Sequence, residues 1–308
     1  MLLVLTGGTG GAKLIEGLLR EVDPTRLTII CNIADDLVLH GLSISPDLDT
    51  IMYTLGGLSD TQKGWGVDGD SFVVLEQLRR YGAETWFQLG DKDIATHLTR
   101  TALLRAGHSL SDATRTLAAQ LKIKATLLPA TDDPVQTRVV TPQGEISFQE
   151  FFVKMHWEPD VRRTYYSGVE KSRPAPGVLE SIATAETIIV CPSNPITSIG
   201  PILAVPGIRD ALKASTAAVV GVSPMIGNSA ISGPAAKLMR SETVESSASG
   251  TARVYRDFLN ALFIDAADAE QSTGIRDLGI SPVVTSIMMR SIDEKRRLAR
   301  EVLAWKGK

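Results

Sequence analysis

Residues 2–13 read Leu-Leu-Val-Leu-Thr-Gly-Gly-Thr-Gly-Gly-Ala-Lys, an apolar run that passes directly into a glycine-rich turn. The short apolar run is typical of a buried strand, and glycines let backbone N–H groups approach a phosphate at the start of the next helix. The turn lacks the Walker ending and does not fit G-x-G-x-x-G cleanly, and a merely tight turn would need fewer glycines. We therefore predict that a phosphate- or nucleotide-binding loop is formed by Gly7, Gly8, Thr9, Gly10 and Gly11.

Similar apolar runs recur along the chain and alternate with helical patterns. Further strands are expected over residues 27–31, 125–128, 187–191, 217–222 and 282–287, and helices over 70–81, 91–105, 111–121, 252–262 and 291–305. This alternation predicts an α/β fold, a Rossmann-like doubly wound and mainly parallel sheet.

One region departs from this alternation. Residues 135–153 have the pattern of two strands joined by a Pro-Gln-Gly turn, and residues 154–176 are polar, aromatic and proline-bearing. We predict a smaller inserted subdomain over 132–176, with the ligand-binding core formed by 1–131 and 177–308. A mobile lid and a surface-covering segment are both open interpretations of residues 154–176.

Composition excludes several classes of partner. The 308 residues carry a net charge of −3 and a pI near 5.9, which disfavours nucleic acid. No run of about 18 apolar residues predicts a membrane span, so we expect a cytoplasmic protein. Cys31 and Cys191 each end an apolar run, where buried thiols are more common than disulfides.

Polar turns follow several of the expected strands. Asn32, with Asp35 and Asp36 after it, follows the second strand and suits a ribose contact, a solvated loop or a helix cap. Ser193 and Asn194 follow the strand over 187–191, and residues 223–228 repeat that arrangement after the next strand. Because the carboxyl ends of parallel strands share one edge, these turns are expected to line one cleft.

Charged residues at two expected helix starts point to chemistry. Asp47 and Asp49 can converge on one hard cation, can divide into a metal ligand and a base, or can merely cap the helix. Lys92 is unfavourable at a helix start, so it is a candidate for a ligand contact. His97 and Arg100 lie three residues apart on one face of the same helix, where a surface or core histidine is the plainer interpretation.

The ordered set of motifs resembles the 2-phospho-L-lactate transferase family of deazaflavin coenzyme F-420 biosynthesis. The segments that carry the resemblance, besides the opening loop, are residues 45–57, 65–72, 89–93, 95–101 and 191–196. The resemblance implies an Mg²⁺-dependent phosphotransferase. It would move a phospholactyl or phosphoenolpyruvyl group from a guanosine diphosphate ester to the ribityl hydroxyl of 7,8-didemethyl-8-hydroxy-5-deazariboflavin (Fo), releasing GMP.

The resemblance also implies roles for particular residues. Asp49 and Lys92 would contact Fo, and Asp47 and Asp49 would hold the metal and carry the catalysis. The glycine loop, together with Asn32, Ser193 and Asn194, would bind the nucleotide. The partners would be Fo and a GDP-linked donor. Apart from the resemblance we expect a homo-oligomer, a dimer, although no pattern in the sequence fixes its symmetry.

Two other functions fit parts of the sequence. A regulatory family with a similar Gly-Gly-Thr-Gly start binds a UDP-sugar, but its second strand is followed by a glycine- and serine-rich segment that this chain lacks. An NAD-dependent oxidoreductase is disfavoured by the imperfect Rossmann spacing. The sequence leaves open whether the donor carries lactate, enolpyruvate or glycerate.

Overall fold

The computed structural model describes residues 1–60 and 63–307 and is built around one seven-stranded sheet. The strand order is β14-β13-β10-β9-β1-β2-β5, and every neighbouring pair is parallel. The strands are β1 (Leu2–Thr6), β2 (Leu27–Cys31), β5 (Thr126–Pro129), β9 (Thr187–Val190), β10 (Ala218–Val222), β13 (Ala261–Asp265) and β14 (Ser281–Thr285). The predicted Rossmann-like α/β fold is therefore confirmed.

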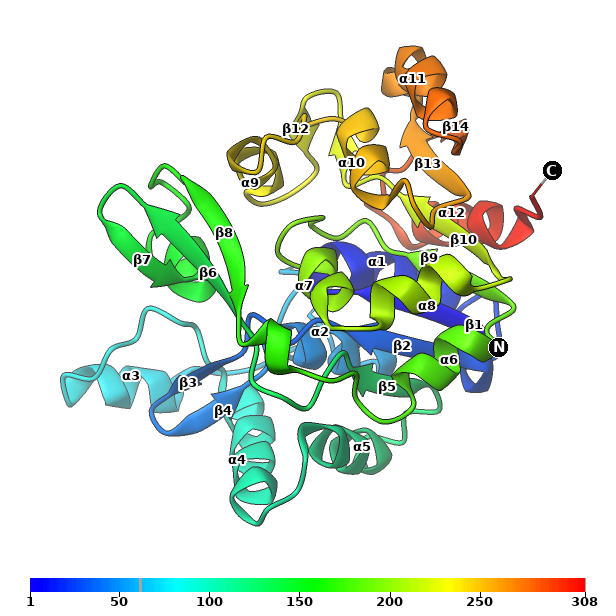
Figure 1. Cartoon of the computed structure of the whole chain (residues 1–308). Helices are drawn as coiled ribbons and strands as arrows, with labels where there is room; N and C mark the ends of the chain where they lie inside the picture. Colours follow the sequence, from blue (N-terminus) through cyan, green and yellow to red (C-terminus); the bar gives the residue numbers. More distant parts are fainter. Residues whose placement is uncertain (61–62, 308) are drawn as a thin grey trace.

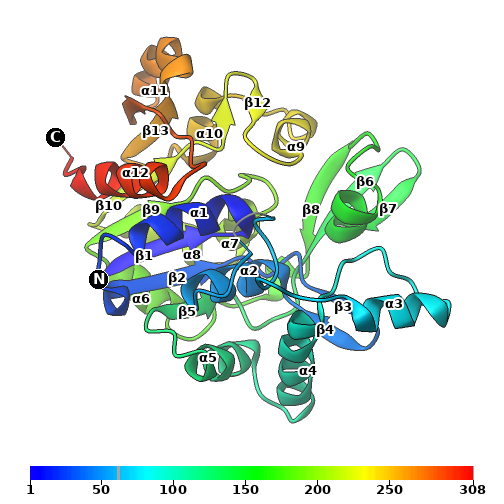
Figure 2. The same cartoon turned by 180° about the vertical axis from the view of Figure 1, so that it is seen from behind.

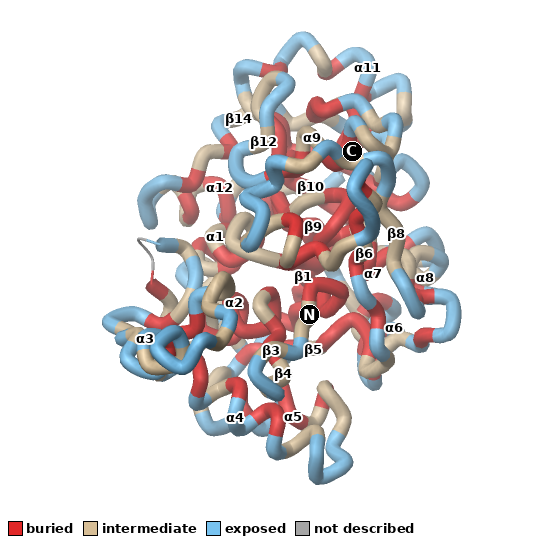
Figure 3. Tube along the Cα trace, turned by 90° about the vertical axis from the view of Figure 1, so that its left-hand side faces the viewer, coloured by how far each residue is buried: buried red, intermediate tan, exposed pale blue. Residues whose placement is uncertain are grey.

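Helices cover both faces of this sheet (Figures 1 and 2). One face carries α1 (Gly8–Leu18), which packs against α12 (Ile292–Ala304) and α2 (Pro46–Leu55). The opposite face carries α6 (Val178–Thr184), α7 (Ile199–Ala204) and α8 (Ile208–Ala214). Coverage on both faces explains why all five residues of β1 and of β2 are buried and why both strands are almost entirely apolar. Figure 3 shows buried chain along the middle of the sheet and exposed chain at the outer turns.

The direction of strand addition reverses at β1. From β1 the chain continues through β2 to β5 on one side, while β9, β10, β13 and β14 follow one another on the other side. Open parallel sheets bind their ligands at such a reversal, in the crevice beyond the carboxyl ends of the strands. The loops after β1 and β9 are therefore the natural place for a site.

A second, antiparallel sheet has the order β7-β6-β8 and lies beside the carboxyl edge of the main sheet. Its strands are β6 (Gln136–Thr141), β7 (Gly144–Ser147) and β8 (Arg163–Ser167). A separate apolar cluster joins this sheet to α9 (Ala235–Ser241). The expected hairpin is present, and all three strands fall within residues 132–176, although the division of the chain into core and subdomain stays a prediction.

The remaining elements flank these two sheets. On the side of β5 lie α3 (Val73–Arg80), α4 (Asp91–Arg105) and α5 (Leu110–Gln120), together with the hairpin β3 (Leu37–Leu39) and β4 (Leu42–Ile44). On the side of β14 lie α10 (Ala248–Tyr255), α11 (Ser272–Asp277) and the short pair β11 (Met225–Ile226) and β12 (Ser229–Ala230). Short helical turns complete the chain at Pro24–Arg26, Glu150–Lys154, Val169–Lys171 and Ala266–Gln271.

Two sequence expectations about secondary structure are wrong. The helix expected over 252–262 ends at Tyr255, and a buried strand, β13, begins at Ala261. The strand expected to continue to residue 153 ends at Ser147 and is followed by a π-helical turn over Glu150–Lys154. In both places no glycine or proline marks the boundary between the two elements.

Among the described residues, no helix is both long enough and apolar enough to cross a bilayer.

Candidate functional site

A cavity of about 550 Å³ lies at the carboxyl ends of β1 and β9, where the strand direction reverses. Its floor includes residues of the glycine loop, of the first turns of α2 and of the loop after β9. One wall comes from the segment that follows β7, residues 148–157, which contains the π-helical turn. Another wall includes residues of α4, and residues 231–235 and 287–290 complete the lining. The cavity lies where doubly wound folds bind their ligands.

The glycine loop has the geometry of a phosphate seat. Gly7 precedes α1 and has no side chain to cap that helix, and the N–H of Gly8 points to the Asp47 carboxylate. The next N–H groups of the first turn receive no cap from Gly7, and the positive end of the helix dipole favours an anion. Ser193 fixes the loop from the neighbouring strand, because its Oγ donates to the carbonyl of Gly7 at 2.7 Å.

The glycines allow chain segments to approach closely. A Cβ on Gly7 would lie 2.5 Å from Oδ2 of Asp47, and a Cβ on Gly10 would lie 2.5 Å from the carbonyl oxygen of Pro192. A Cβ on Gly11 would overlap Oγ1 of Thr6. Side chains at these positions would force the loop away from both α2 and the β9 loop.

The predicted nucleotide residues divide into two groups. The cavity is lined by Gly7, Gly8, Thr9, Gly10, Ser193 and Asn194. The other two have packing roles: Gly11 lies against Thr6, and the buried Asn32 donates from Nδ2 to Asp47 at 2.9 Å and to the carbonyl of Thr197 at 3.2 Å. Asn32 thus orients a carboxylate that lines the cavity.

Asp47 lies in the first turn of α2 beside the glycine loop. It is buried, it accepts from Asn32, and the N–H of Gly8 points to it. Burial raises the pKa of Asp47 to about 6. Asp35 also lines the cavity, and burial together with the charge of Asp47 raises its pKa well above the ordinary range. A phosphate bound here would meet carboxylates that have to be neutralised by a proton or a cation.

Asp49 is held by a different partner. Both of its oxygens accept from Arg100 of α4, one of them from Nη1 at 3.0 Å, and the Arg100 side chain is only 1% exposed. The ion pair fixes the orientation of the buried Asp49 carboxylate. The two neighbouring aspartates of α2 therefore differ in environment: Asp47 lies at the glycine loop, and Asp49 at α4.

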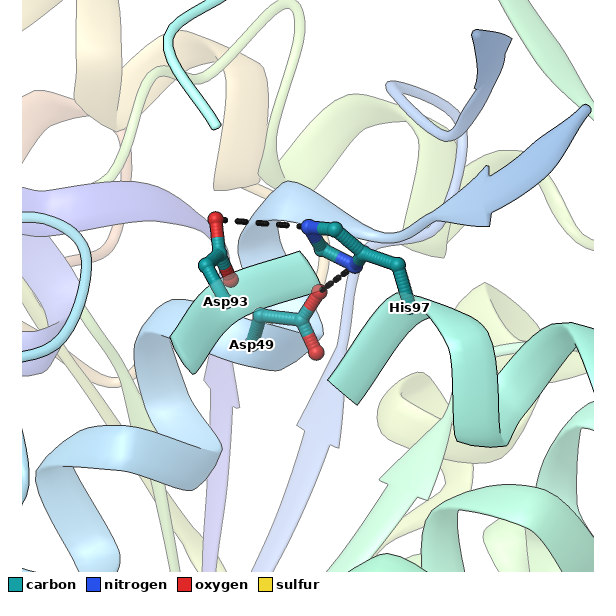
Figure 4. A group of neighbouring side chains, drawn as sticks. All are labelled: Asp49, Asp93 and His97. Atoms are coloured by element: carbon teal, nitrogen blue, oxygen red, sulfur yellow. Dashed lines mark ion pairs between the residues drawn. The ribbon is translucent and has the colours of Figure 1, made fainter. Parts of the chain in front are cut away.

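His97 joins this ion pair to a second carboxylate (Figure 4). Its Nδ1 lies 3.5 Å from Oδ2 of Asp49, and its Nε2 lies 3.3 Å from Oδ2 of Asp93. Tyr53 donates its hydroxyl to the other oxygen of Asp93 at 2.6 Å. Burial and the two carboxylates raise the pKa of Tyr53, so it stays a donor. Sequence alone placed His97 and Arg100 on one helix face but gave no sign of Asp49 as their partner.

One group of cavity residues offers ligand atoms that suit a hard cation. Asp47 and Asp35 offer carboxylate oxygens, and Oδ1 of Asp35 is buried without a hydrogen-bond partner. Asp49, Asp93 and His97 also bring ligand atoms within 4.8 Å of one another, but Asp49 is already paired with Arg100. The oxygen-rich group at Asp47 therefore fits Mg²⁺ better than the group that contains a histidine.

Lys92 lies outside the cavity lining. Its Nζ donates to the carbonyl of Asp68 at 2.9 Å, and its backbone N–H donates to Asp70 at 2.8 Å. The described cations that do line the cavity are Lys13, Lys63 and Arg290, none of which the sequence analysis singled out. Of residues 223–228, Pro224 alone is part of the lining.

Comparisons with known proteins agree along nearly the whole chain. Residues 2–288 match the family described as 2-phospho-L-lactate transferase CofD. A 2-phospho-L-lactate transferase of Methanosarcina mazei is 40% identical over 302 residues, which cover 98% of this chain and 99% of that protein. A phosphoenolpyruvate transferase of Streptomyces griseus is 42% identical over 308 residues, which cover 98% and 97%.

A solved structure gives independent support for the fold. A member of the UPF0052 family from Bacillus halodurans superposes with a TM-score of 0.65 over 98% of each chain, at 17% identity.

Proposed function

Because the chain belongs to the 2-phospho-L-lactate transferase CofD family and is a transferase, we propose that it transfers a phospholactyl or phosphoenolpyruvyl group to the ribityl hydroxyl of Fo. The donor is a guanosine diphosphate ester, and the products are coenzyme F-420-0, or its dehydro form, and GMP. The observation that carries the proposal is the cavity in which the glycine loop and Asp47 lie side by side. The two relatives named above support the class of group that is transferred.

The reaction needs charge neutralisation and alignment more than covalent help. The ribityl oxygen attacks the phosphorus that carries the lactyl or enolpyruvyl group, and the bond from this phosphorus to the bridging oxygen breaks. GMP leaves with that oxygen. Backbone N–H groups of the glycine loop stabilise the charge on the phosphate oxygens, while Lys13, Lys63 and Arg290 add positive charge at the lining.

Mg²⁺ belongs to the proposal as the cation beside the diphosphate, where it would supply further neutralisation of the leaving group. The predicted ligands are Asp47 and Asp49. Asp47 accepts only from the neutral donors Asn32 and Gly8, with the unpartnered oxygen of Asp35 near it, whereas both oxygens of Asp49 accept from the cationic Arg100. Asp47 is therefore the ligand on which the proposal depends most.

The acceptor proton has a receiver on the same helix. Asp49 lines the cavity, and the side chains of His97 and Asp93 continue the chain of polar groups beyond it. We assign Asp49 to contact with the ribityl hydroxyl and to removal of its proton. A contact from Lys92 to Fo stays a prediction, since it requires the ammonium group to leave the carbonyl of Asp68. A dimer and a cytoplasmic location also stay predictions.

Mass spectrometry of the product tests this function. The protein is incubated with Fo and, in turn, the lactyl, enolpyruvyl and glyceryl donors, with Mg²⁺ or with EDTA. In the incubations with Mg²⁺, we expect a phosphorylated deazaflavin from one of the donors, together with an equal amount of GMP. In the incubations with EDTA, we expect neither product. Absence of any deazaflavin product with all three donors would overturn the proposal, and undiminished turnover in EDTA would overturn the role of the metal.

A further inference from the structure

Three aromatic rings from one short segment form a continuous stack at the cavity wall. The centroids of Phe148 and Phe152 lie 5.5 Å apart with their planes 7° from parallel. Those of Phe152 and Trp157 lie 5.3 Å apart at 19°. All three residues line the cavity, so the stack borders the space that a ligand would occupy.

The backbone that carries this stack is strained. Phe152 belongs to the π-helical turn Glu150–Lys154, a form that occurs frequently at functional sites. His156 and Trp157 follow with φ of 50° and 49°, and two successive residues with side chains in the left-handed region are unfavourable. Strain of this kind persists only where neighbouring contacts hold it.

Two lysines supply those contacts. Nζ of Lys237, on α9, donates to the carbonyls of Trp157, Glu158 and Pro159 at 2.8, 3.0 and 3.1 Å. Lys154 pairs with Glu84 at 2.9 Å. The segment is thus fastened from both sides in a conformation that leaves Trp157 41% exposed. Because the indole stays partly exposed, its burial does not offset the free-energy cost of this backbone conformation. A ligand stacked on the indole would offset it.

We propose that Phe148, Phe152 and Trp157 form a stacking platform for the fused aromatic ring of the deazaflavin acceptor. The inference rests on the proposed function and adds to it the surface that binds the acceptor ring. A flat fused ring parallel to this stack extends it by one member and is held by its face.

The chemistry of the lining assigns the platform to the acceptor and not to guanine. The nucleotide of the donor has its phosphate seat at the glycine loop, and Ser193, Asn194 and Thr197 beside that loop offer hydrogen-bonding groups. The platform instead ends in the partly exposed ring of Trp157, and a broad tricyclic ring gains more from stacking on such a face than a purine does. The acceptor ring then lies at the wall while its ribityl chain extends toward Asp49 on the floor.

Binding measurements on four proteins test the platform. The variants are Trp157→Ala, Trp157→Phe and Tyr81→Ala, the last being an aromatic side chain that is 77% exposed away from the cavity lining. Dissociation constants for Fo come from its own fluorescence, and those for GDP from calorimetry. Circular dichroism and thermal melting show whether each variant is folded, and Phe152→Leu replaces Trp157→Ala if the latter is not.

The expected results separate the platform from the function. Trp157→Ala weakens Fo binding about tenfold, the loss expected for one stacked ring, and leaves GDP binding unchanged. Trp157→Phe retains most of the affinity, Tyr81→Ala retains all of it, and turnover of Trp157→Ala shows a raised KM for Fo with kcat little altered. Fo binding within twofold of wild type in Trp157→Ala, or a loss confined to GDP, would overturn the platform. A wild-type protein that binds no Fo would instead overturn the proposed function, and the platform with it.

Discussion

The floor and the wall of the cavity are built on opposite principles. The floor carries buried carboxylates, of which Asp49 is paired with Arg100 of α4 and Asp47 is fixed by Asn32. The wall consists of aromatic rings that stack on one another and leave Trp157 partly exposed. Charges out of water need partners of fixed geometry, whereas stacked rings tolerate change. We therefore expect substitutions in the floor to cause large losses of stability or turnover, and substitutions in the wall to cause small changes in stability and affinity.

The largest expected effect is on stability, from breaking the ion pair of the floor. Arg100→Met leaves Asp49 buried without its partner, which costs about 3–5 kcal/mol of the free energy of unfolding. Urea denaturation measures this loss, and turnover should disappear with it because Asp49 loses its orientation.

Arg115→Met is the matched control, since Arg115 pairs with Asp112 on the surface and is 75% exposed. Loss of that pair should cost less than about 1 kcal/mol. Equal losses in the two variants would contradict the view that burial gives the floor its sensitivity.

Asp47→Asn is expected to separate activity from stability. Removal of the carboxylate at the glycine loop should lower turnover by at least about 100-fold, because it removes the proposed metal ligand. Stability should move the other way. In the folded protein Asp47 holds its proton up to pH 6 or so, whereas in the unfolded chain it loses the proton near pH 4.

The folded protein therefore binds more protons between these two values, and the free energy of unfolding falls as pH rises through the window. Asp47→Asn removes this dependence and should stabilise the protein above pH 6 by up to about 2–3 kcal/mol. Melting temperatures from pH 4 to pH 8 check the sign. If the melting temperature of the variant depends on pH as that of the wild type does, then ionisation of Asp47 is not what lowers the stability of the folded protein as pH rises.

Glycines of the floor give the next smaller effect. Gly10→Ala places a Cβ against the backbone carbonyl of Pro192 and should cost about 1–3 kcal/mol while weakening GDP binding. Gly274→Ala, in α11, meets no atom closer than 3.9 Å and should stabilise the protein by about 0.5–1 kcal/mol. Denaturation and GDP titration of both variants decide. A harmless Gly10→Ala would mean that the loop does not need its close approach to β9.

The contrast between floor and wall also explains what the sequence could predict. The glycine loop and the turn at Asp47 follow local rules, because a strand end, a glycine run and a helix start leave marks within a few residues. Arg100 lies 51 residues from Asp49, so their pairing depends on how α4 packs against α2. Spacing on a helix shows which side chains share a face but not what that face meets.

The wall was harder to predict for a different reason. Residues 144–153 have the apolar pattern of a strand, and no glycine or proline marks where β7 ends and the π-helical turn begins. The left-handed pair His156 and Trp157 carries no glycine either. Contacts from Lys237, which is 80 residues away, override local preference there.

The smallest expected effect tests whether the wall is strained. His156→Gly relieves a left-handed conformation that costs about 1–2 kcal/mol, and it gives back about 0.5–1 kcal/mol through the freer unfolded chain. The net change should be a stabilisation of up to about 1 kcal/mol, measured by urea denaturation. His108→Gly is the control. Because His108 has an ordinary φ, this substitution relieves no strain and should destabilise the protein slightly.

If His156→Gly stabilises the protein and His108→Gly destabilises it, the turn before Trp157 is strained and is held in place by the contacts of Lys237 and Lys154. A loss of stability in His156→Gly larger than in the control would mean that the imidazole itself supports the wall. In that case the aromatic stack would depend on a specific side-chain contact, as the floor does. The two regions would then differ only in that the floor is charged and the wall is not.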